Sequence, residues 1–227
     1  MGKVYHSSGM DPESLHQKVG GTEVQRLPVM PLSSGAVSGV DTLRRLCVDH
    51  AQGVIEIPSM RSVLQQVEGV LPELLDDERG WSGLKIVRAG TLSRLHRRFG
   101  NGFRVFLHRV DPCFEGQPFY HYHQWPMIVK VLEGAYEMGI GAAGGSEAPS
   151  IICAIKEIRA PFQYEMPNKN GWHYTRALGD QPTWSLAIIG EPWDRPQPYG
   201  ATPEVEDVLL EEKRAMLAKF RSFYPKG

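Results

Sequence analysis

Between residues 84 and 189 the chain repeats one pattern, in which short runs rich in β-branched and aromatic residues alternate with clusters of turn-forming residues. The runs are residues 84–88, 103–110, 126–132, 135–140, 151–158 and 184–189. The turn clusters are residues 100–102, 133–134, 141–150, 167–171 and 179–180. Short strands that follow one another in this way are typical of an antiparallel sandwich or barrel. The pattern therefore predicts a mainly β domain over this part of the chain.

The segments on either side of the strand-rich region have helical patterns. Asp41 precedes an apolar stripe formed by Leu43, Leu46 and Cys47, and a second stripe runs through residues 63–75. Residues 203–220 predict a packing helix, with acidic residues early and basic residues late, as the helix dipole favours. We expect a flexible tail at 1–22, a helical section at 23–83 packed on the barrel, the barrel at 84–194, and a C-terminal extension and helix at 195–227.

The composition limits the possible classes of function. The chain has 227 residues, of which 41% are hydrophobic, enough for one sizeable core. Its 25 basic and 26 acidic residues are balanced and form no basic run, so we expect no nucleic-acid partner. The apolar runs are shorter than a membrane span, so we also expect no membrane association. Three scattered cysteines without CxxC spacing argue against a disulfide framework and favour a reducing cytoplasm.

Three histidines are spaced as metal ligands. His121 and His123 are two residues apart in a strand-like run, so both imidazoles point to the same face of a strand. His173 lies in a later strand-like run and can supply a third ligand from a neighbouring strand. Three neutral imidazoles suit a catalytic transition metal, above all non-haem iron, although zinc, copper and nickel also accept them. The other five histidines are interpreted as surface or satisfied core residues, namely His6, His16, His50, His96 and His108.

The two histidine segments resemble the paired motifs of the cupin superfamily, small β-barrels with a metal inside. The resemblance implies a cupin-type antiparallel β-barrel, also described as a double-stranded β-helix or jelly roll. Pro126 and Met127 stand where the usual cupin motif has a glutamate, three or four residues beyond the second histidine, so the site would have histidine ligands only. A dication held by neutral imidazoles keeps its full charge and favours anionic co-ligands such as a thiolate or an enolate.

A narrower resemblance, over about residues 92–194, is to the cysteine dioxygenase family of three-histidine iron thiol dioxygenases. The segments that carry it, in the family's order, are Gly100-Asn101-Gly102-Phe103, the HxH pair, Lys130-Val131-Leu132-Glu133-Gly134, His173, Trp184-Ser185-Leu186 and Glu191-Pro192-Trp193-Asp194. The resemblance implies that His121, His123 and His173 bind Fe(II). It also implies that Arg94, six residues before the first glycine of GNG, binds a substrate carboxylate. A guanidinium suits this role because it can hold a carboxylate through two parallel hydrogen bonds.

Several polar groups of that family are missing here. Ala187 and Ile189 replace the histidine and tyrosine of the family's Ser-x-His-x-Tyr arrangement, although Ser185 is kept, and Leu92 replaces a tyrosine two residues before the arginine. The aromatic residues nearby in sequence are Tyr122, Trp125, Trp172 and Trp184. We therefore expect a bulkier, more aromatic or cationic thiol than free cysteine. Gln124 and Ser185 are candidates for hydrogen bonds that orient the ligand histidines.

The resemblance predicts an iron-dependent dioxygenase that oxidises a small-molecule thiol to a sulfinic acid with O2, acting as a monomer or homodimer. Two other functions stay open. One is a three-histidine cupin dioxygenase that acts on a phenol, an enol or a diketone, and the other is a non-catalytic cupin that binds a small ligand. The chain has no GxSxG motif and no GxxxxGK phosphate loop, which argues against serine hydrolysis and against P-loop nucleotide chemistry.

Overall fold

The computed structural model describes residues 59–87, 91–99, 103–113, 121–123, 125–143, 149–167, 171–191 and 205–227. Within these ranges the helices are α2 (Met60–Asp76), the 3-10 helix η2 (Glu78–Gly80) and α3 (Leu210–Phe223). The strands are β1 (Ser82–Val87), β2 (Thr91–Arg98), β3 (Arg104–Val110), β4 (His121–Tyr122), β5 (Met127–Glu133), β6 (Ala135–Ala143), β7 (Pro149–Arg159), β8 (Phe162–Met166), β9 (Gly171–Ala177), β10 (Thr183–Ile189) and β11 (Val205–Glu206). The predicted tail at 1–22 and the predicted helix after Asp41 lie outside the described residues.

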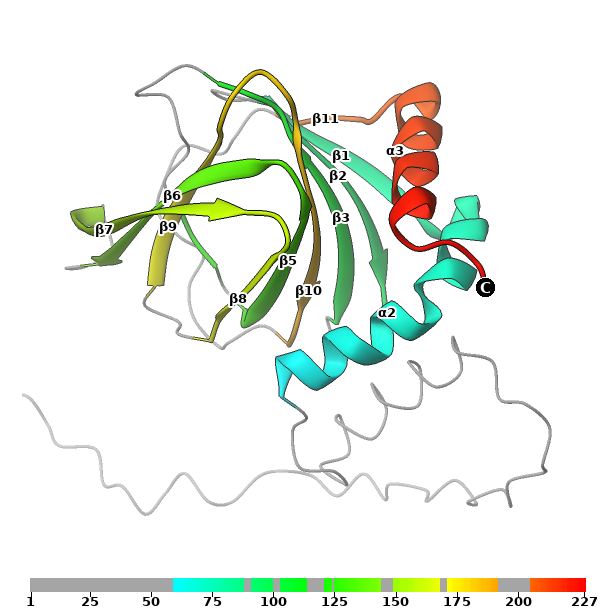
Figure 1. The fold of residues 1–227 in the computed structure, drawn as a ribbon, viewed down its shortest axis with the longest axis horizontal. Coiled ribbons are helices and arrows are strands. Elements are labelled where there is room, and N and C mark those ends of the chain that lie inside the picture. The colour runs from blue at the N-terminus through cyan, green and yellow to red at the C-terminus, as the bar shows by residue number, and fades with distance from the viewer. Residues whose placement is uncertain are drawn as a thin grey trace, which may run out of the picture. The chain divides into compact units, whose positions relative to one another are not determined.

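The strands form two sheets in the order of a jelly roll (Figure 1). One sheet has the order β11-β1-β2-β3-β10-β5-β8 and the other β4-β9-β6-β7. From β3 to β10 the chain changes sheet at every step except the β6–β7 hairpin, which is the connectivity of a double-sheet jelly roll. Side chains from both sheets meet between them, where Val131 on β5 packs with Tyr136 and Met138 on β6. The predicted fold class, a mainly β jelly roll with flanking helices, is confirmed.

Each predicted run of strand residues coincides with a strand, but β2, β8 and β11 were not predicted as strands. β2 and β8 lie in stretches that sequence patterns do not mark as strands. β2 has the sequence TLSRLHRR, and its charged residues hide the alternation of a half-buried strand. β2 is nevertheless paired along its whole length, with β1 on one side and β3 on the other.

The prediction for the C-terminal helix was wrong at its start. We expected a helix over 203–220, whereas Val205–Glu206 forms β11 and pairs with β1, and α3 begins only at Leu210. The edge of β1 offers unpaired backbone groups, and pairing satisfies those of residues 205 and 206 in a way that a helical turn cannot. In the described part of the chain, no helix has both the length and the apolar character that a membrane crossing requires.

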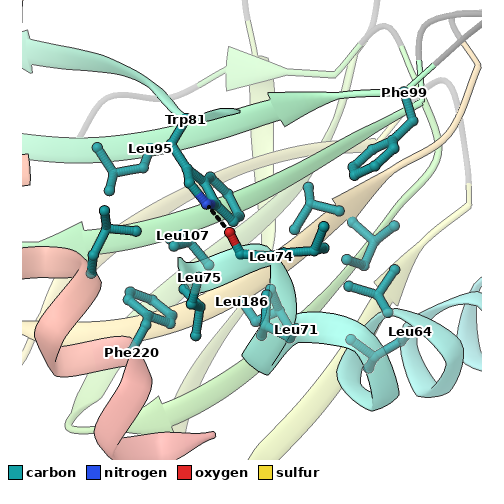
Figure 2. Packing of buried hydrophobic residues seen from close by; sticks show 14 of the residues in the cluster. Leu64, Leu71, Leu74, Leu75, Trp81, Leu95, Phe99, Leu107, Leu186 and Phe220 are labelled. Atoms are coloured by element: carbon teal, nitrogen blue, oxygen red, sulfur yellow. Dashed lines mark hydrogen bonds between the residues drawn. The ribbon is translucent and has the colours of Figure 1, made fainter. Parts of the chain in front are cut away.

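The main core lies between the seven-stranded sheet and the two helices α2 and α3 (Figure 1). Val67, Leu71 and Leu74 on α2 are fully buried in this core. Figure 2 shows Leu71 and Leu74 with Leu107 and Leu186 of the sheet. The residues that pack in this core recur at helical spacing, which explains why residues 60–76 form an amphipathic helix. The indole Nε1 of Trp81 donates a hydrogen bond of 2.8 Å to the Leu74 carbonyl and ties the end of α2 to the start of the sheet.

Strand alternation sends the intervening residues to the opposite face of this sheet, which is turned toward the four-stranded sheet and is called the inner face below. Leu107 and Leu186 belong to the core under the helices, whereas Phe106 and Ala187 belong to a separate cluster. That second cluster also contains Met127, Val129 and Ile189. Because each residue in register with Phe106 or Ala187 shares their face, the strand pairing shows which polar side chains point into the jelly roll.

Candidate metal centre

Two short strand segments bring the three predicted ligands together. β4 pairs antiparallel with β9, and this register places His121 directly opposite His173. His123 follows β4 and lies two residues after His121, so the extended chain turns both imidazoles to the same side. The local pairing of β4 with β9 is therefore the reason that residues fifty positions apart form one group.

The three imidazoles lie within reach of one ion. Their candidate ligand atoms all lie within 4.8 Å of one another. The Nε2 atoms of His123 and His173 are 2.8 Å apart, and the centroid of the His121 ring lies 4.8 Å and 4.7 Å from those of His123 and His173. Imidazole nitrogens bind first-row metals at about 2 Å, which brings two nitrogens on the same ion to about 3 Å from each other. The separation of His123 and His173 matches that of two ligands on one ion, and His121 is close enough to be a candidate for the third.

Burial keeps these histidines in the form that binds metal. It is the main cause that lowers the pKa of His173 well below 6.5, and the charge of His121 adds to it. Burial also lowers the pKa of His123 well below 6.5, with the charge of His121 as the next cause. Both imidazoles are neutral at pH 7, as a metal ligand must be. The donor set therefore fits a divalent first-row transition metal, and histidines are its only members within the described ranges.

The residue at the place of the cupin glutamate cannot serve as a ligand. The side chain of Met127 is buried in the apolar cluster with Phe106 and Val129. The neighbouring Pro126 accepts a backbone hydrogen bond of 2.9 Å from Gly190 through its carbonyl. Among the described residues, the site therefore presents three imidazoles and no carboxylate ligand, as the sequence predicts.

Ser185 and Gln124 are the residues predicted to orient the ligand histidines by hydrogen bonds. The Nδ1 atom of His173 is buried and has no hydrogen-bond partner among the described residues. Ser185 is buried on β10 in register with His108, but it does not serve as that partner. Gln124 lies outside the described residues. An unsatisfied buried polar atom costs about 1–3 kcal/mol, so His173 Nδ1 marks a place where a further polar group belongs.

Arg94 lies on the inner face of β2, in register with His108 on β3. Its guanidinium carbon is 5.2 Å from the centroid of the Phe106 ring, which belongs to the inner cluster. Burial is the main cause that lowers the pKa of His123, and the charge of Arg94 is among the smaller causes. The arginine predicted to bind a carboxylate is therefore in electrostatic range of the metal centre.

The guanidinium of Arg94 is partly desolvated and lacks a carboxylate partner in the described part of the chain. Its Nε is buried and makes no hydrogen bond. Burial, with a contribution from the charge of Arg104, lowers the pKa of Arg94 to about 10. Even so the side chain is charged at pH 7. A buried cation without a counter-charge is costly, and an anionic ligand would offset that cost.

His96 and His108 were not predicted to lie near the site. Both lie on the inner face beside Arg94, His96 in register with Phe106 and His108 in register with Arg94 itself. Burial lowers the pKa of His108 to about 3, and the charge of Arg94 adds to this. His96 was interpreted as a satisfied or surface residue, but its Nδ1 is buried without a partner in the described ranges. Had residues 91–98 been predicted as a strand, the alternation of Arg94 with His96 would have placed both on one face.

The aromatic residues expected near the metal divide between the two faces. Trp125 is close to the site, with its ring centroid 6.3 Å from that of His123. Trp184 is not, because it packs under the helices with its ring 5.9 Å from Phe220 (Figure 2 shows Phe220 in this core). The side chains of Tyr122 and Trp172 lie outside the described part of the structure.

Comparisons with known proteins place the chain in no family. No protein-family model matches it. No curated protein matches it in sequence. Among solved structures, hydroxypropylphosphonic acid epoxidase from S. wedmorenis is similar with a TM-score of 0.39 and 16% identity, over 50% of this chain and 56% of that enzyme. A Bacillus halodurans protein is similar with a TM-score of 0.37 and 15% identity, over 57% of this chain and 83% of that one. The Drosophila melanogaster CENP-C cupin domain is similar with a TM-score of 0.34 and 12% identity, over 44% of this chain and 69% of that one.

Proposed function

We propose that this protein is a non-haem iron-dependent dioxygenase that oxidises a small carboxylate-bearing thiol, other than free cysteine, to a sulfinic acid. The observation that supports it is the convergence of three imidazoles inside the jelly roll, with an arginine of the facing sheet in electrostatic range. The resemblance of the motifs to the cysteine dioxygenase family points to the same chemistry. The likenesses to solved structures have no part in this proposal.

The chain's residues have separate tasks in this reaction. His121, His123 and His173 hold the metal and leave the other coordination positions to substrate and O2. Fe(II) at this site would supply the redox chemistry that joins O2 to sulfur. Arg94 binds the substrate carboxylate and turns the thiol toward the histidines, so that the reacting atoms meet in a fixed geometry.

The overall reaction balances without a further reductant. A thiol RSH and O2 give RSO2H, in which both oxygen atoms are bonded to sulfur and the proton stays with the acid. Two electron pairs pass from sulfur to oxygen. No residue of the protein has to donate electrons in this reaction.

Free cysteine fits the site poorly because of its ammonium group. The ionisable groups on the inner face beside Arg94 include His96, His108 and Arg104, which are all basic, and Ser185 adds one neutral hydroxyl. An ammonium would add a further positive charge there, and Ala187 and Ile189 offer it no acceptor. The basic surroundings therefore favour a thiol with an anionic group and no ammonium, in place of the cationic thiol that the aromatic residues had led us to expect.

Oxygen uptake tests the proposal directly. Protein purified without oxygen is freed of metal with a chelator, loaded with Fe(II), and given 3-mercaptopropionate, cysteine or cysteamine. We expect O2 uptake with 3-mercaptopropionate, and a product in which both atoms of 18O2 are bonded to sulfur. The His121→Ala variant is expected to lose both bound iron and O2 uptake, because two histidines remain.

Two variants separate the role of Arg94 from a general effect of charge. Arg94→Gln is expected to raise KM for 3-mercaptopropionate by about tenfold or more, because it removes charged hydrogen bonds to the carboxylate. Arg79→Gln removes an exposed charge from η2, outside the inner face, and should leave KM unchanged. Cleavage of carbon–carbon bonds in an enol or diketone would instead identify the second kind of dioxygenase. Bound metal without O2 uptake for any substrate would identify a ligand-binding cupin.

A further inference from the structure

The inner face carries a second basic position beyond Arg94. Arg104 opens β3, two inner-face positions away from His108, and its guanidinium carbon lies 4.8 Å from the centroid of the Trp125 ring. Trp125 in turn neighbours the ligand His123. Arg104 therefore lies along the same interior surface as the metal centre and Arg94, at the end of the strand.

Buried nitrogens without hydrogen-bond partners lie along this surface. The buried atoms Arg94 Nε, His96 Nδ1 and Trp125 Nε1 make no hydrogen bond with any described residue. His96 lies two residues after Arg94 on β2 and in register with Phe106, which is two residues after Arg104 on β3. Its ring is 5.7 Å from that of Phe106. Buried polar groups are satisfied in nearly all native structures, so three unsatisfied atoms along one surface need a common explanation.

The electrostatics of this surface agree with the geometry. Burial lowers the pKa of His96, and the charges of Arg94, Arg98 and Arg104 lower it further. Burial, followed by the charge of Arg104, lowers the pKa of Arg94. The basic groups therefore act on one another inside the jelly roll, and each anionic group placed among them relieves more than one repulsion.

We propose that the substrate is a thiol with two carboxylates, one bound by Arg94 and the second bound near Arg104 by the Trp125 indole N–H and by His96. The proposal rests on the proposed function for the thiol and the metal, and it adds the second anionic group. A substrate with one carboxylate satisfies Arg94 but leaves Trp125 Nε1 and His96 Nδ1 buried without partners. An apolar substrate leaves all three atoms unsatisfied.

The binding of dicarboxylates that lack a thiol tests this site without any catalysis. Metal-free protein is titrated with succinate, glutarate and propionate in a calorimeter at low ionic strength. We expect one of the two dicarboxylates to bind about tenfold or more tightly than propionate, because a second carboxylate gains charged hydrogen bonds. The length of the dicarboxylate that binds more tightly indicates the spacing between the two carboxylate positions.

Two variants remove the second position and leave the first intact. Trp125→Phe keeps the aromatic ring under Arg104 but removes the N–H donor, and Arg104→Gln removes the charge. Each is expected to reduce the preference for a dicarboxylate over propionate to about threefold or less, since only the second carboxylate loses its partners. Arg79→Gln is the control, because it removes an exposed charge from η2, outside the inner face, and should preserve the preference.

Kinetics with iron-loaded protein then separate this inference from the proposed function. With 2-mercaptosuccinate and 2-mercaptoglutarate, kcat/KM should exceed that for 3-mercaptopropionate, and Arg104→Gln should cancel the advantage. Equal rates for the three thiols, with no effect of Arg104→Gln, would overturn the second carboxylate and leave the thiol dioxygenase standing. Dicarboxylate binding that depends on Arg104 and Trp125, without oxidation of any thiol, would keep the anion site and reject the thiol reaction.

Discussion

Burial decides the protonation state of the candidate ligands at the scale of single residues. In the folded chain, burial is the main cause of the lowered pKa of both His123 and His173. A metal competes with protons for an imidazole, so a lowered pKa protects the site from acid. The same burial that makes these residues costly as cations therefore makes them effective ligands under mildly acidic conditions.

Metal affinity is predicted to depend only weakly on pH above pH 6. Two histidines with an ordinary pKa of about 6.5 would lose more than about tenfold in metal affinity between pH 7.5 and pH 6.0, through protonation alone. Because His123 and His173 titrate well below 6.5, we expect a smaller loss. Competition of the protein with a chelator for Co(II), at both pH values, measures it. A loss of tenfold or more would contradict the assignment of these two residues as buried neutral ligands.

The ligands could be predicted from sequence because they follow a local rule. His121 and His123 share a face whenever residues 121–123 are extended, and this needs no knowledge of the fold. The pairing of His121 with His173 is different, because it depends on the register of β4 with β9, and two strand residues carry too little pattern to fix a register. There the resemblance to a known family supplied what periodicity could not.

At the scale of elements, β2 shows why hydrophobic periodicity fails to predict a strand that carries functional residues. Its outer positions include Ser93 and Arg97, so the face that packs under the helices is polar in part. Ser93 donates a hydrogen bond of 2.6 Å to Glu212 of α3, and Arg97 pairs with Asp77 at 2.9 Å. These contacts satisfy polar groups where the pattern would require apolar ones. Arg94 was therefore found by its motif, while its neighbour His96 was missed.

Helix α2 is predicted to stabilise the sheet through its buried stripe. Leu71 is fully buried among Leu107 and other residues of the main core, so Leu71→Ala should lower the free energy of unfolding by about 2–5 kcal/mol. Glu73 is exposed on the same helix, and Glu73→Ala should change stability by less than about 0.5 kcal/mol. Urea unfolding followed by circular dichroism compares the two variants. Equal stabilities would show that α2 is not part of the cooperative core.

Gly139 on β6 is predicted to be required for the correct position of β9, the strand that carries His173. It lies opposite Tyr174 on β9, and a Cβ added at Gly139 would overlap the tyrosine ring. The Tyr174 hydroxyl donates a hydrogen bond of 2.9 Å to Glu137, so the ring is held across the glycine. Gly139→Ala should lower the free energy of unfolding by about 1–3 kcal/mol, and it should weaken metal binding because Tyr174 adjoins His173.

A glycine with open space around it provides the control for this prediction. A Cβ at Gly69, in α2, would contact nothing. Gly69→Ala should stabilise the protein by about 0.5–1 kcal/mol through helix propensity and leave metal affinity unchanged. Thermal unfolding of the metal-free variants, together with Co(II) titration, compares the two. A Gly139→Ala variant as stable as the parent would show that the ring of Tyr174 moves aside at no cost.

At the scale of the whole molecule, the alternation of strand runs and turn clusters in the sequence predicted the fold class, but it did not predict the order of the strands in the sheets. Hydrophobic periodicity does not predict that β3, β10, β5 and β8 lie side by side in that order, because each pair of neighbours is distant in sequence. The order arises because each sheet must bury one face against the other, and the chain crosses between them at nearly every connection. The interior that results brings basic groups of β2 and β3 opposite the histidines of β4 and β9.

An interior lined by neutral histidines is predicted to make the metal-free protein sensitive to mild acid. His96, His108, His123 and His173 have a lowered pKa in the folded state, mainly through burial. Between that pKa and about 6.5 the unfolded chain binds more protons than the folded one, so the free energy of unfolding falls as the pH falls. For His108 this window extends from about 6.5 down to about 3.

Urea unfolding of the metal-free protein at pH 7.0, 6.0 and 5.0 isolates this effect from the carboxylates. Glu137, whose pKa Arg176 holds below 4.5, begins to lose its contribution only when the pH falls below about that value. Each histidine contributes at most about 1.4 kcal/mol per pH unit to the slope of the free energy of unfolding against pH. The free energy of unfolding lost between pH 7.0 and 5.0 should therefore be larger than one histidine alone can account for. His108→Leu should reduce the slope. A free energy of unfolding that is constant over this pH range would mean that the histidines are solvated when the metal is absent. The interior lined by neutral histidines would then exist only in the metal-bound protein.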